Sequence, residues 1–138
     1  VQDNQAKPCS PVLWVGLGCQ PGVSSALIEA AIHQVCAAHH LNAALIFGIA
    51  TLDTKATEAG ILDLCTERQW ALRWFSAEQL RAVQVPNPKA NVMAKVATPS
   101  VAEAAAILAA QAPLSVSKQI VRQPGEPGVT IAIAQSQP

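Results

Sequence analysis

The chain has 138 residues, 51% of them hydrophobic, and its nine basic and nine acidic residues give a formal net charge of zero. This length and apolar content predict one domain with a packed core. The balanced charge, without a basic stripe, argues against nucleic-acid binding, and no apolar run approaches the roughly 20 residues of a membrane span. Because the first residues are polar and unlike a signal peptide, we expect a cytoplasmic protein with reduced thiols.

Residues 12–80 alternate between short apolar runs and amphipathic stretches, which predicts strands and helices in turn. The predicted strands are VLWVGL (12–17), AALIFGIA (43–50) and ALRWF (71–75). The predicted helices begin at Ser24 or Ser25, near Thr54 or Thr57, and at Ser76, where Gln79 completes a capping box. Residues 1–10 are interpreted as a flexible tail ahead of a single domain over residues 11–138.

The second half of the chain predicts one long helix and a hairpin. The prolines of VPNP (85–88) exclude regular structure there. A helix is predicted over residues 99–111, with Ser100 and Glu103 as a second capping box. LSVSKQI (114–120) and VTIAIA (129–134) follow as paired strands. The whole pattern predicts an α/β fold with a mixed, mostly parallel sheet of about five strands and helices on both faces.

Ligands of open α/β sheets bind at the carboxyl ends of the strands. Three predicted loops lie there, at residues 18–25, 51–57 and 75–77, and each leads into a helix N-terminus. Such termini offer unpaired N–H groups and partial positive charge, which suit carboxylates or phosphates. This hypothesis requires the three strands to be neighbours in the sheet.

The first loop, GLGCQPG, misses the dinucleotide spacing GxGxxG because position 21 is proline, so no nicotinamide cofactor is expected. Gly18 serves either a tight turn or a close backbone approach to a ligand. Cys19, just before a helix, is either an activated thiol or a small apolar filler. Ser24 is a candidate cap for the helix that follows.

The second loop gathers Asp53, Lys55 and Glu58 at the end of a buried strand, in a chain with few charges. In one interpretation, Asp53 caps a helix and the other two form its solvated first turn. In the other, Lys55 reaches a ligand carboxylate while Asp53 positions a water or hydrogen-bonds the ligand. Asp53 and Glu58 are the candidates for acid–base catalysis, but no complete catalytic constellation is evident.

Lys118 is either an exposed edge lysine or a second ligand contact. The four cysteines form no CxxC pair, and His33, His39 and His40 are interpreted as surface residues. We therefore expect neither a metal site nor a bound cofactor.

Seven motifs follow one another in an order that resembles the CobE/CbiG C-terminal domain family of cobalamin (vitamin B12) biosynthesis. They are GLGCQPGVS, ATLDTKATEAGILDL, WFSAEQL, VPNP, TPSVAEAAAILAA, LSVSKQ and VTIAIA. The resemblance covers about residues 12–135 and is greatest to stand-alone CobE, since the chain has no room for the preceding CbiG domains. It departs at Gln20 and Pro21, where the family often carries basic residues.

The resemblance implies a three-layer α/β/α sandwich that binds, and carries or processes, a precorrin or corrin tetrapyrrole. Such macrocycles have apolar faces and a rim of carboxylates. The residues expected to face the ligand are Gly18, Cys19, Ser24, Thr51, Asp53, Lys55, Ser76 and Lys118. Two alternatives stay open: a cobalt-precorrin-5A hydrolase-type lactone opening, and a module that docks onto other pathway enzymes. The apolar content also leaves homodimerisation open.

Overall fold

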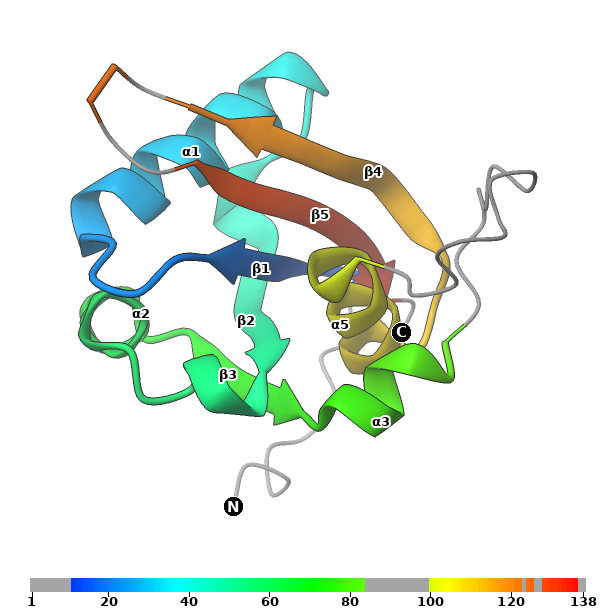
Figure 1. Cartoon of the computed structure of the whole chain (residues 1–138). Helices are drawn as coiled ribbons and strands as arrows, with labels where there is room; N and C mark the ends of the chain where they lie inside the picture. Colours follow the sequence, from blue (N-terminus) through cyan, green and yellow to red (C-terminus); the bar gives the residue numbers. More distant parts are fainter. Residues whose placement is uncertain (1–10, 84–99, 123, 126–127, 137–138) are drawn as a thin grey trace.

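A computed structural model describes residues 11–83, 100–122, 124–125 and 128–136. One sheet contains five strands in the order β3-β2-β1-β5-β4 (Figure 1). The strands are β1 (Val12–Cys19), β2 (Ile46–Leu52), β3 (Ala71–Phe75), β4 (Leu114–Val121) and β5 (Val129–Ser136). The α-helices are α1 (Ser25–Ala38), α2 (Ala59–Arg68), α3 (Ala77–Arg81) and α5 (Val101–Ala110), and the 3-10 turns are η2 (Ala43–Leu45) and η3 (Asp53–Lys55).

The sheet is mixed. β1 pairs in parallel with β2, and β2 with β3, whereas β5 pairs antiparallel with both β1 and β4. Four strands therefore run in one direction and β5 runs against them, which confirms the predicted mixed, mostly parallel sheet. Because β1, β2 and β3 are parallel neighbours, their carboxyl ends lie along one edge of the sheet.

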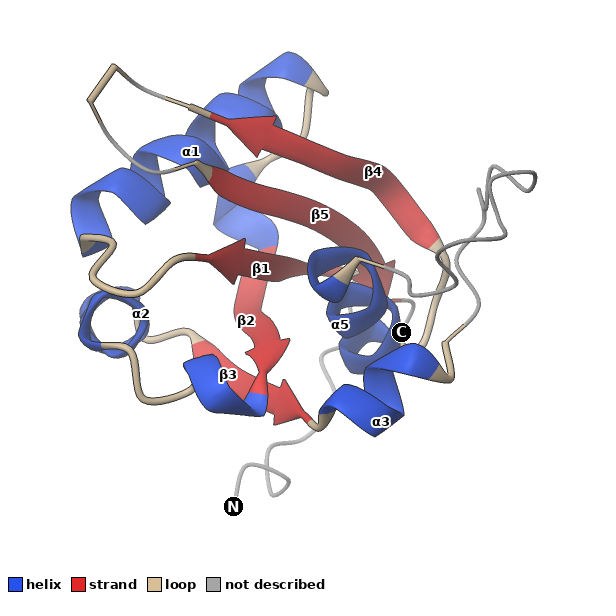
Figure 2. Ribbon diagram, in the orientation of Figure 1, coloured by secondary structure: helices blue, strands red, loops and turns tan. Residues whose placement is uncertain are grey.

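Helices cover both faces, which completes the three-layer α/β/α sandwich (Figure 2). The first face packs against α1 and α2 through a core that includes Leu13, Val15 and Leu17 of β1. The second face packs against α3 and the alanine-rich α5, with Trp14 and Leu80 in its core. Successive side chains of β1 thus point into the two cores in turn, as expected for a strand that is buried on both faces.

The close approach of α5 to the sheet depends on small residues. A Cβ added at Gly16 would lie 1.9 Å from the Ala102 carbonyl oxygen, so the backbone of α5 touches the backbone of β1. Ala102, Ala105 and Ala106 of this helix are buried. Gly16 is therefore fixed by packing, because any side chain would displace the helix.

Most predicted caps are present. Ser24 accepts a hydrogen bond from the Leu27 N–H, and Ser76 and Gln79 make both bonds of their capping box. The box at Ser100 is only half formed, because the Glu103 carboxylate accepts the Lys118 N–H of β4 instead. The predicted irregular segment VPNP and the predicted helix start at Pro99 lie outside the described residues.

Two predicted boundaries are wrong. Residues 43–45, predicted as strand, form η2, because the Asn42 side chain accepts the Ala44 N–H and folds the chain into a 3-10 turn. The second helix begins at Ala59 instead of near Thr54 or Thr57, since η3 intervenes and Glu58 is extended. No helix within the described ranges has the length and apolar character needed to cross a membrane.

Candidate functional site

The loops after β1 and β2 meet at the edge where these strands end. The Gly22 N–H donates to the Glu58 carboxylate at 3.1 Å, across 36 positions of sequence. A Cβ added at Gly60 would lie 2.3 Å from the Val23 carbonyl oxygen, so the start of α2 packs directly on the segment before α1. Gly22 itself has a φ of +84°, which favours glycine. We call this contact between residues 18–25 and 51–58 the loop junction.

The third predicted loop lies at the same edge but leads to the other face of the sheet. Phe75 at the end of β3 pairs with Leu52 at the end of β2. The chain then enters α3, which packs against α5, whereas the loop junction belongs to the face of α1 and α2. The structure thus brings two of the three predicted helix N-termini together on one face, with Ser76 of the third on the other side.

Cys19, Lys55 and Glu58 lie close enough at the loop junction to interact electrostatically. Burial raises the pKa of the half-buried Cys19 thiol, Lys55 lowers it, and Glu58 raises it. Because the net shift is upward, this thiol is protonated at neutral pH and is a poor nucleophile. This result favours the interpretation of Cys19 as a small filler against the α1/α2 core over that of an activated thiol.

Asp53 does not cap a helix, contrary to the first interpretation of the second loop. It begins η3, makes no capping hydrogen bond and is exposed. The residue that precedes α2 is Glu58, and its carboxylate binds Gly22 instead of the N–H groups of its own helix. The charges therefore crowd after β2 because the chain makes a separate turn there before α2 begins.

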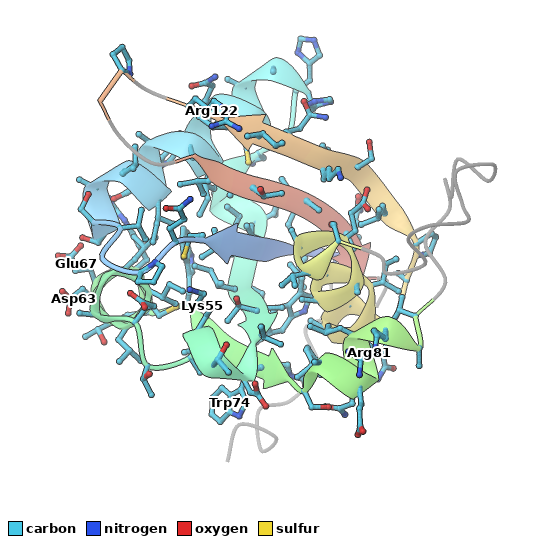
Figure 3. All side chains as sticks on the ribbon, in the orientation of Figure 1. Lys55, Asp63, Glu67, Trp74, Arg81 and Arg122 are labelled. Atoms are coloured by element: carbon cyan, nitrogen blue, oxygen red, sulfur yellow. The ribbon has the colours of Figure 1, made fainter. Side chains whose placement is uncertain are left out.

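Lys55 is the one half-buried cation of the loop junction. The salt-bridge contacts in the described parts of the chain are an ion pair of Glu29 with Arg68 and a 3.4 Å contact of the same carboxylate with the His33 ring. None of them involves Lys55. Figure 3 places Lys55 beside the loop between β1 and α1, close to the start of α2. Among the described residues, no carboxylate therefore forms an ion pair with its ammonium group.

The predicted hydroxyl and glycine contacts have mostly structural roles. Thr51 is fully buried, and its hydroxyl donates to the Leu17 carbonyl oxygen at 2.8 Å, which joins β2 to β1. Ser24 and Ser76 cap α1 and α3. A Cβ at Gly18 would meet only the Thr130 Cβ, at 3.6 Å, so the protein itself does not require glycine there.

The structure does not bring Lys118 to the loop junction. Lys118 is exposed on β4, which β5 and β1 separate from β2. Its backbone N–H donates to Glu103 of α5, on the opposite face from α2. Any ligand contact of Lys118 would therefore belong to a different surface from that of Lys55.

No metal site or catalytic pair is assembled from the side chains that the structure describes. No group of three His, Cys, Asp or Glu residues within these ranges could hold a metal ion. Of the two catalytic candidates, Asp53 is exposed and Glu58 is bound to Gly22. The arrangement suits the binding of an anion better than proton transfer.

Sequence reasoning missed the backbone contacts that build the junction. Gly60 stands in the first turn of a helix, where glycine is unfavourable, and this is a signal of close packing. The bond between Gly22 and Glu58 has no such signal, because it joins distant parts of the chain. Trp74, whose side chain is 54% exposed at the same edge, was also missed.

Replacing Glu58 by glutamine is expected to speed alkylation of Cys19, because the Glu58 carboxylate raises the pKa of this thiol. The amide oxygen of glutamine can still accept the Gly22 N–H, so the loop junction keeps its shape. The rate is measured with iodoacetamide at about pH 8 and mass spectrometry. A Cys9→Ser background removes one of the other three thiols, and burial raises the pKa of the remaining two, Cys36 and Cys65, the latter to about 11.

Two further variants serve as controls for this experiment. Lys55→Ala should slow the alkylation, since the ammonium group lowers the same pKa. Glu58→Ala should speed it more than Glu58→Gln does, because the loop also loses its bond at Gly22. An unchanged or slower rate in Glu58→Gln would contradict the electrostatic coupling.

The fold and this edge can be compared with known proteins. Residues 13–134 match the model of the family described as Cobalamin synthesis G C-terminus. A curated relative, the cobalt-precorrin-5A hydrolase of Priestia megaterium, is 28% identical over 97 residues, which are 70% of this chain. The chain spans about a quarter (26%) of the length of that relative.

Two solved structures are similar over most of their length. One is CobE, a protein from the cobalamin (vitamin B12) biosynthetic pathway, which aligns with a TM-score of 0.74. The alignment covers 95% of this chain and 98% of the CobE chain, and at 24% sequence identity it shows that the two share a fold. The other is the cobalamin biosynthesis protein chiG from Agrobacterium tumefaciens, which is 30% identical and aligns with a TM-score of 0.66. That alignment covers 91% of this chain and 98% of the chiG chain. The resemblance inferred from the order of the motifs is thereby confirmed, and the chain belongs to the Cobalamin synthesis G C-terminus family of cobalamin biosynthesis.

Proposed function

We propose that the chain binds a precorrin or corrin intermediate at the loop junction and carries it or holds it for processing. The observation that carries this proposal is the half-buried Lys55, which has no ion pair among the described side chains. An ammonium group that is partly withdrawn from water is stabilised by a nearby negative charge, so its position at the carboxyl edge of the sheet suits an anionic ligand.

The backbone around Lys55 adds to this preference. The N-termini of α1 and α2 both begin at the loop junction, and each contributes unpaired N–H groups and a partial positive charge. A tetrapyrrole rimmed with carboxylates would supply several anionic groups to such an edge. Each charge-assisted hydrogen bond to a carboxylate contributes roughly 1.5–3 kcal/mol net, so two or three of them give useful affinity.

Opening of a precorrin lactone is the second candidate, because the relative from Priestia megaterium is named a cobalt-precorrin-5A hydrolase. Two observations rank it lower. The chain corresponds to only 26% of that relative, and the Glu58 carboxylate is already bound to Gly22. A hydrolase would need Asp53, which is exposed, to work as an acid or base without a positioned partner.

The test is a spectroscopic titration of the purified protein with metal-free and cobalt-containing precorrins, followed by mass analysis of the released ligand. Saturable binding with an unchanged mass is expected. Loss of a two-carbon fragment would instead establish the hydrolase. The absence of binding to either ligand would overturn the proposal and leave docking onto other pathway enzymes as the surviving hypothesis.

A further inference from the structure

Trp74 is the most exposed large apolar side chain that the structure describes, at 54%. Of the other tryptophans, Trp14 is only 5% exposed and Trp70 is half-buried against the α1/α2 core. The aromatic contacts in the described ranges join Trp14 to Phe47 and to Arg73, and neither includes Trp74. The indole of Trp74 thus contributes little to the fold and leaves a large apolar surface in water.

The position of Trp74 connects it to the candidate site. Trp74 pairs with Thr51 across β3 and β2, so it lies beside the end of β2, where η3 begins. Leu72, two positions earlier on the strand, packs against the core beneath α1 and α2. The alternation of side chains along a strand therefore places Trp74 on the same face as the loop junction. β3 contacts η3, the turn that carries Lys55, and Figure 3 shows the Trp74 ring at the outer side of this turn, with Lys55 on its other side toward the β1–α1 loop.

We propose that Trp74 stacks against the apolar face of the tetrapyrrole whose rim carboxylate binds Lys55. This inference rests on the proposed function and assigns the surface that recognises the macrocycle itself. A ring held by one edge through charge alone would be free to swing. An exposed indole beside the same turn provides a flat apolar surface, and stacking on an aromatic side chain tolerates variation in the ligand because it needs only a π-face.

The chemistry of the surrounding residues favours this ligand over a protein partner. The exposed residues of the adjoining turn are polar, with Asp53 and Thr54 both exposed. The other exposed large apolar side chains lie on separate elements, Leu45 on η2, Leu62 on α2 and Ile120 on β4. A single exposed aromatic ring and a cation on adjacent elements fit a ligand wide enough to reach both, with an apolar face and an anionic rim, whereas protein interfaces have a larger apolar centre.

The test compares the affinities of three variants for cobyrinic acid, a corrin whose rim carboxylates are free, by absorbance titration. Trp74→Ala is expected to bind about tenfold more weakly, within the range that alanine substitution of a stacking residue produces. Trp74→Phe keeps a ring and should stay within about threefold of the original chain. Ile120→Ala is the matched control, since Ile120 is 53% exposed on the opposite edge strand, and it should leave the affinity unchanged.

Urea denaturation of the same variants distinguishes the loss of a ligand contact from a loss of fold stability. Trp74→Ala should unfold at nearly the same urea concentration as the original chain, because its ring is exposed. Equal affinities of Trp74→Ala and the original chain would overturn the stacking inference while the proposed function stood. Equal weakening by Trp74→Ala and Ile120→Ala would also overturn it. If the original chain bound no corrin or precorrin at all, the proposed function and this inference would fall together.

Discussion

Gly16→Ala is expected to lower the free energy of unfolding by about 3 kcal/mol, the upper part of the usual range for overpacking a core. The added Cβ would lie 1.9 Å from the Ala102 carbonyl oxygen, and this neighbour is helix backbone, which cannot rotate away as a side chain can. The whole of α5 must therefore shift from β1. Urea denaturation followed by circular dichroism measures the change.

Gly18→Ala is the matched control for this prediction, two positions later on the same strand and face. Its added Cβ would meet only the Thr130 Cβ at 3.6 Å, an ordinary contact. We expect its stability to change by less than about 0.5 kcal/mol, and the loss of glycine freedom in the unfolded chain can even stabilise it. Similar stabilities of the two variants would show that α5 does not pack on β1 as described.

The elements that could be predicted from the sequence are those with local causes. The helix that begins at Ser25 and the short helix after Ser76 have caps within three residues of their starts, and both are where the pattern places them. The region after β2 could not be predicted in this way. There, α2 begins late because Gly60 packs on the Val23 carbonyl oxygen and Glu58 binds Gly22, both far away in sequence.

The same distinction explains what could be predicted of the site. The rule that parallel strands end at one edge correctly brought the loops after β1 and β2 together. Which side chains remain free there depends on tertiary contacts that no local pattern contains. The Thr51 hydroxyl is used by the Leu17 carbonyl oxygen, and Glu103 leaves its capping box to bind the Lys118 N–H. The exposure of Trp74 likewise follows from β3 being an edge strand, which only the strand order reveals.

The two lysines that the sequence analysis singled out are expected to differ sharply. Lys55→Ala should weaken precorrin binding by about 10- to 100-fold, because it removes one charge-assisted bond of roughly 1.5–3 kcal/mol at the loop junction. Lys118→Ala should leave the affinity within about twofold, since Lys118 lies on β4 with its backbone tied to α5 on the other face. Absorbance titrations at low ionic strength measure both affinities.

A Lys55→Arg variant and a change of salt test whether charge is the cause. Arginine keeps a cation at the junction, so this variant should recover most of the affinity that Lys55→Ala loses. Because Lys55 is half-buried, its contribution should persist to moderate salt, whereas a contact made by an exposed lysine would be screened. Equal effects of Lys55→Ala and Lys118→Ala would mean that the ligand does not distinguish the loop junction from the β4 edge of the sheet, and the loop junction would then be the wrong site. A loss confined to Lys55→Ala would place the carboxylate rim at the turn after β2, where Asp53, Lys55 and Glu58 follow one another.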